Sequence, residues 1–145
     1  MRKALLLLIV PLALAVGSFA QTPDATFPKV VAVFHRCDQT DTISKAPIFT
    51  PKAGGLFRFT IYGEILKAAS DKGAYWSPTF TFTNHLSEGT FNFVMPASPQ
   101  TTSLFGSTVW DREGFPISVG VNSVGDVSGS EYNITIVVEQ LMSSD

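Results

Sequence analysis

Residues 56–65 read LFRFTIYGEI, and this stretch decides the fold that the sequence predicts. In an extended chain, Phe57, Phe59 and Ile61 fall on one side, whereas Tyr62 and charged or polar residues fall on the other. This period of two is typical of a β-strand with one face buried and one face solvated. The stretch therefore predicts one half-buried strand near the middle of the chain.

Similar apolar alternation continues on both sides of this stretch. The other expected strands are residues 30–35, 42–50, 75–83, 90–95, 102–110, 116–122 and 132–141. Proline- and glycine-containing turns separate them about every dozen residues, and no segment has a convincing helical period. We therefore predict an all-β fold, an antiparallel β-sandwich of about eight strands. A jelly roll is favoured, and an immunoglobulin-like strand order stays open. Pro78 removes one ladder donor, so we expect an edge or a bulge there.

The N-terminus has the features of an export signal. A short basic start precedes uncharged residues 4–16, and Ser18 and Ala20 are the small residues that a signal peptidase reads. We expect a signal peptide at 1–20, a flexible leader at 21–28 and one β-sandwich domain at 29–145. A secreted, extracellular or periplasmic location follows. No later segment is apolar enough to span a membrane after cleavage.

The charge balance excludes some partners. The 145 residues carry a formal charge of −2, and removing residues 1–20, with two basic and no acidic side chains, changes it to −4. Binding to nucleic acid would need a concentrated positive field, so we expect none. The single cysteine, Cys37, excludes a disulfide framework and cysteine-rich zinc sites. It is either a small buried or half-buried thiol, an intermolecular disulfide partner or a reactive thiol, and His35 would share its face on a strand.

Two stretches resemble a known family. Residues 49–59, FTPKAGGLFRF, resemble the F-x-P-x-x-G-x-Y-x-F stretch of the complement C1q and tumour necrosis factor-like jelly rolls, with Leu56 or Phe57 where that family often has tyrosine. Residues 114–117 together with 132–141 resemble the last two strands of those domains. The resemblance implies a compact homotrimer with aromatic strands buried between protomers. It also implies a binding or structural role without catalytic residues.

Recognised catalytic and metal-binding motifs are missing from the sequence. It contains no G-x-S-x-G, H-E-x-x-H or C-x-x-C, so we expect no enzyme activity, metal or cofactor. The candidate binding residues are Tyr62 and Tyr75, aromatic side chains on polar strand faces that are suited to ligands or subunits, together with Trp110 as an exposed ring and Asp111 beside it.

Three functions follow from these features. The first is a secreted, non-enzymatic protein acting by self-association or binding. The second is a small carbohydrate- or peptide-binding module with exposed aromatic residues. The third is an exported enzyme that uses His35, Cys37 and Asp38 or Asp41.

Overall fold

The protein is built entirely from β-strands in the part of the chain that the structure describes. The structure, a computed structural model, describes residues 28–84, 86–98 and 102–144. The strands are β1 (Lys29–Gln39), β2 (Ile43–Phe49), β3 (Gly55–Lys67), β4 (Tyr75–Thr83), β5 (Glu88–Asn92), β6 (Met95–Pro96), β7 (Thr102–Asp111), β8 (Ile117–Val124) and β9 (Glu131–Ser143). The expected signal peptide at 1–20, and all of the expected leader except Pro28, lie outside the described residues.

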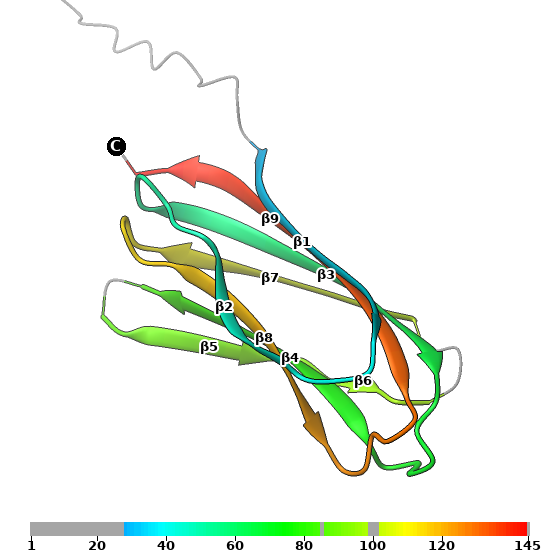
Figure 1. The fold of residues 1–145 in the computed structure, drawn as a ribbon. Coiled ribbons are helices and arrows are strands. Elements are labelled where there is room, and N and C mark those ends of the chain that lie inside the picture. The colour runs from blue at the N-terminus through cyan, green and yellow to red at the C-terminus, as the bar shows by residue number, and fades with distance from the viewer. Residues whose placement is uncertain (1–27, 85, 99–101, 145) are drawn as a thin grey trace, which may run out of the picture.

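The strands form two antiparallel sheets that face each other (Figure 1). One sheet has the order β1-β9-β3-β7, and the other has the order β2-β8-β4-β5 with β6 also paired to β4. The pairs β1–β9, β2–β8, β3–β7 and β4–β5 are nested, as in one long hairpin that has been rolled up. This nesting is the jelly-roll order, so the predicted jelly-roll sandwich is confirmed and the immunoglobulin-like order is excluded.

Aromatic side chains join the two sheets. Phe57, Phe59 and Ile61 of β3 are buried, as their spacing predicted. The Phe59 ring packs against Phe80 of β4 in the opposite sheet, with ring centroids 5.0 Å apart. Such tilted aromatic pairs add to the stabilisation that the buried apolar area already gives.

The largest buried rings lie nearer one end of the sandwich. Trp76 and Tyr132 pack with centroids 4.5 Å apart. Trp76 Nε1 donates a hydrogen bond to Ser130 Oγ at 3.0 Å, and the Tyr132 hydroxyl donates to the Asp41 carbonyl at 2.9 Å. Burial, together with the negative charge of Asp41, raises the pKa of Tyr132. Both polar tips are thus paired inside the core, as buried polar groups require.

Pro78 lies in a central strand and pairs with Val121 of β8 without a register shift, so neither the expected edge strand nor the expected bulge is found there. Strand β4 pairs with β8 on one side, and on the other side its partner is interrupted between β5 and β6. The Pro78 carbonyl accepts a hydrogen bond from the Phe93 amide at this interruption. The expected strand at 90–95 is therefore divided in two, which gives nine strands rather than eight.

We expect the Phe59→Ala substitution to destabilise the fold by about 3–5 kcal/mol, because it removes a fully packed ring between the sheets. Urea unfolding followed by tryptophan fluorescence measures this change in the free energy of unfolding. Thr108→Ala, on an exposed position of β7, is the control and should change the free energy by less than about 0.5 kcal/mol. Equal effects of the two substitutions would contradict the assigned core.

Candidate functional site

The outward side of the β1-β9-β3-β7 sheet carries exposed apolar side chains. We call this side the outer face. The strand register places Tyr62 of β3 between Thr135 of β9 and Leu104 of β7. Tyr62 is 50% exposed and Leu104 is 66% exposed, and Val33 of β1 is also exposed on this side of the sheet. The outer face thus presents apolar groups that the fold itself does not bury.

A charged pair lies on the same face. Arg58 Nε donates to Glu139 Oε2 at 2.7 Å across β3 and β9. This hydrogen bond holds the pKa of Glu139 below its ordinary value. Exposed ion pairs contribute little stability, so this one mainly fixes the positions of two polar groups beside the apolar side chains.

The aromatic candidates do not form one site. Tyr62 lies on the outer face, but Tyr75 lies on β4 in the other sheet and is half-buried. Trp110 is also half-buried, and it pairs with Leu56, six residues along β3 from Tyr62, a separation of about 20 Å. Only Tyr62 has the open position that the sequence suggested, and a single ligand stacking on all three rings does not fit this arrangement.

Asp111 is placed differently from its expected position beside a binding surface. It is fully buried at the end of β7, where its Oδ1 accepts a hydrogen bond from the Thr83 amide at 2.7 Å. Burial raises the pKa of Asp111, opposed by the backbone hydrogen bonds of Thr83 and Arg112. The residue thus links the ends of β7 and β4 across the two sheets and does not face solvent.

We expect the Asp111→Asn substitution to change the pH dependence of stability. A raised pKa means that the folded state holds the Asp111 proton more tightly than the unfolded state does. This stabilisation is complete below the unfolded pKa of about 4 and is lost as pH rises through the folded pKa. Urea unfolding midpoints should therefore show that the stability of the variant, relative to wild type, is higher at pH 7 than at pH 4. A larger relative gain at pH 4 would contradict this assignment.

Cys37 is exposed, so the interpretation as a buried thiol is wrong. Its Sγ lies 2.9 Å from His35 Nε2, and His35 Nδ1 lies 2.7 Å from Thr135 Oγ1 on β9. A register shift in β1 lies between Arg36 and Gln39, and Asp38 within it has a φ of 52°. Thr135 is the third member that the sequence did not reveal, because it lies 100 residues from His35.

In this arrangement an imidazole can activate the Cys37 thiol as a nucleophile. The imidazole nitrogen at 2.9 Å can accept the thiol proton, and the Thr135 hydroxyl holds the ring in place. Next to the ring is a shallow hollow of about 330 Å³, lined by His35, Tyr62, Gly63, Glu64, Thr102, Asn133 and Thr135. Asp38 and Asp41, the acidic residues of the third hypothesis, make no side-chain hydrogen bond to His35 among the described contacts.

We expect Cys37 to react with an aromatic disulfide reagent at pH 7, releasing one thiolate per chain. The His35→Ala substitution should slow this reaction about tenfold, because the thiol loses its proton acceptor. The released thiolate is followed by absorbance, and Cys37→Ser gives the background. An unchanged rate in His35→Ala would show that the imidazole does not assist the thiol.

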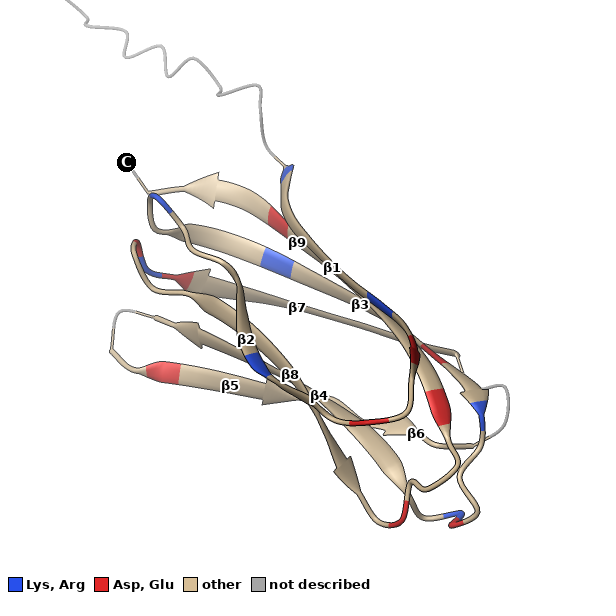
Figure 2. Cartoon of the chain, in the orientation of Figure 1, with Lys and Arg blue, Asp and Glu red and all other residues tan. Residues whose placement is uncertain are grey.

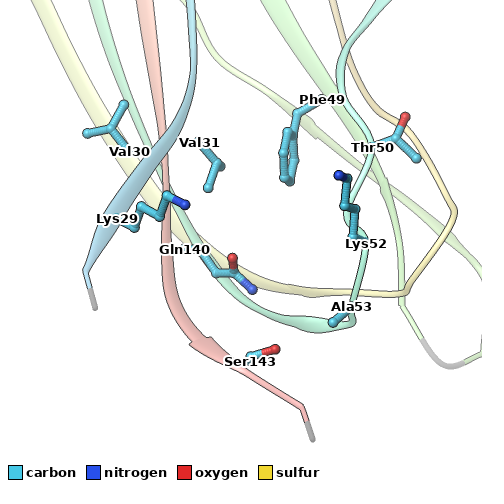
Figure 3. Close-up of a pocket in the computed structure, with 9 residues that line it drawn as sticks. All are labelled: Lys29, Val30, Val31, Phe49, Thr50, Lys52, Ala53, Gln140 and Ser143. Atoms are coloured by element: carbon cyan, nitrogen blue, oxygen red, sulfur yellow. The ribbon is translucent and has the colours of Figure 1, made fainter. Parts of the chain in front are cut away.

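A second hollow lies at one end of the sandwich, between the start of β1 and the turn that joins β2 to β3. Its volume is about 400 Å³, and it is lined by Lys29, Val30, Val31, Phe49, Thr50, Lys52, Ala53, Gln140 and Ser143 (Figure 3). We call it the end pocket. Figure 2 shows one basic segment at the start of β1 and another in the β2–β3 turn, both at this end of the molecule. The end pocket therefore combines apolar and basic lining.

The described residues contain no group of three or more His, Cys, Asp or Glu side chains that could hold a metal ion. Within the same ranges there is no helix long and apolar enough to cross a membrane.

The chain has weak structural matches among known proteins. No family model and no curated protein matches the chain. Among solved structures, the globular domain of a zebrafish complement 1qA protein is 12% identical, with a TM-score of 0.46 over 78% of this chain and 98% of that one. Eiger TNF from S. frugiperda is 7% identical, with a TM-score of 0.41 over 81% of this chain and 96% of that one.

A third solved structure is an enzyme. A ruminal GH26 endo-β-1,4-mannanase is 16% identical, with a TM-score of 0.42 over 83% of this chain. The matched part is only 22% of the mannanase chain. Independently of these matches, the strand order in the structure itself is that of a jelly roll.

Proposed function

We propose that this protein is exported and acts without catalysis, by assembling with copies of itself through the outer face. The observation that carries the proposal is the pair of neighbouring exposed side chains, Tyr62 and Leu104, on a strand register that leaves them uncovered. Exposed apolar groups gathered on one face mark association surfaces in soluble proteins. Tyrosine is among the residues enriched in such surfaces.

The assembly we propose is a homotrimer. Three copies are what the resemblance of residues 49–59 to C1q and tumour necrosis factor-like jelly rolls implies. The polar neighbours of the two exposed groups, Thr135 and the Arg58–Glu139 pair, fit the rim of an interface whose centre is apolar. Export follows from the proposed signal peptide at 1–20.

We expect the Leu104→Arg substitution to convert the trimer to a monomer, because it places a charge at the centre of the proposed interface. The protein is expressed with its full sequence, and its mass in solution is measured by light scattering after size-exclusion chromatography. The intact mass of the same sample reports whether residues 1–20 have been removed.

Leu86→Arg is the matched control. Leu86 is 93% exposed in the segment between β4 and β5, so the same change of side chain there should leave the trimer intact. A monomeric wild-type protein would overturn the proposal. So would a trimer that Leu104→Arg and Leu86→Arg affect equally.

A further inference from the structure

The end pocket has the composition of a binding site for an amphipathic anion. Phe49 and Val31 supply its apolar surface, and Figure 3 shows Lys29 and Lys52 on opposite sides of these two residues. None of the nine described residues that line the pocket is acidic. A ligand there would meet positive charge from two directions and apolar contact between them.

The apolar surface of the pocket is held in place by the core. The Phe49 ring packs against the buried Phe57 ring, with centroids 5.9 Å apart. Val31 also packs against the buried core cluster. Sites of this kind are usually formed before the ligand arrives, which lowers the entropy cost of binding.

The two lysines are unpaired within the described ranges. The ion pairs found there join Lys45 to Glu88 and Arg58 to Glu139. Neither Lys29 nor Lys52 takes part in an ion pair with the described acidic residues, although the whole chain carries two more acidic than basic side chains. Their charge is thus available to an anion from outside, and charge-assisted hydrogen bonds to a carboxylate are stronger than neutral ones.

We propose that the end pocket binds a small amphipathic carboxylate, with its apolar part against Phe49 and Val31 and its carboxylate attracted by Lys29 and Lys52 at the two sides of the pocket. The side-chain amide of Gln140 and the hydroxyl of Thr50 line the same space and supply further hydrogen-bonding groups. A volume of about 400 Å³ is at the small end of the range for ligand pockets, so the ligand is a short-chain or medium-chain molecule. This inference uses residues other than Tyr62 and Leu104, so its failure would leave the proposed assembly untouched.

The test uses octanoate as the probe and the wild-type protein as expressed. Amide proton–nitrogen NMR spectra are recorded during a titration well below the concentration at which octanoate forms micelles. We expect saturable shifts at Val31, Lys52 and Ala53, and none at Asp71 to Gly73 in the distant β3–β4 connection. For a ligand of this size the dissociation constant should be about a millimolar.

Matched ligands separate charge from apolar contact. Octan-1-ol has the same chain without the carboxylate, and octyltrimethylammonium has the opposite charge. We expect octanol to bind at least about fivefold more weakly than octanoate, and the cation to give no saturable shifts at the pocket. Raising the salt concentration should weaken octanoate binding, because both lysines are exposed to screening ions.

Matched variants locate the charge. Lys29→Gln and Lys52→Gln should each weaken octanoate binding about fivefold. Lys72→Gln removes an equal charge from the β3–β4 connection and should leave the affinity unchanged. The proposal is overturned if octanoate gives no saturable shifts at the pocket, if octanol binds as tightly, or if Lys72→Gln weakens binding as much as the two pocket variants.

Discussion

The rest of the structure depends on the pairing of β3 with strands from the other half of the chain. Strand β3 lies between β7 and β9, and both pairs are antiparallel over most of its length. Its register fixes which residues of β7 and β9 face the core, because side chains alternate along every strand. Phe59 and Ile61 consequently meet the opposite sheet, while Arg58 and Tyr62 face outward. A shift of one residue would exchange the inward and outward sets. It would bury the Arg58 guanidinium and expose the apolar side chains of Phe57, Phe59 and Ile61.

This pairing also builds the sites that the sequence could not show. His35 and Thr135 are 100 residues apart but directly paired between β1 and β9. Lys29 and Lys52 border one pocket because β1 and the β2–β3 turn meet at the same end of the sandwich. Local spacing correctly suggested that His35 and Cys37 share a face. It contained no information about which distant residue would lie beside them.

The strands themselves were largely predictable, because one buried face imposes a local period of two. The expected strand at 56–65 lies within β3, and that at 75–83 coincides with β4. The division of 90–95 into β5 and β6 was not predictable from that segment, since its cause is Pro78 on the neighbouring strand. The need for glycine at position 63 also comes from a neighbouring strand. A Cβ at this position would collide with Sδ of Met95, so the glycine makes space for a side chain from β6.

The binding residues were harder to predict than the core, because exposure depends on where a strand ends and what crosses it. Asp111, as a charged side chain, suggested a surface position. At the end of β7 its carboxylate instead accepts a hydrogen bond from the Thr83 amide. Strand β4 ends at Thr83, so a side chain takes the place of a neighbouring strand as the acceptor. Tyr62 lies in the middle of β3, where both neighbours are paired strands and the outward direction leads only to solvent. Whether a side chain faces the core or solvent is therefore predicted more reliably from sequence in the middle of a strand than at its end. The proposed association surface consists of such middle positions.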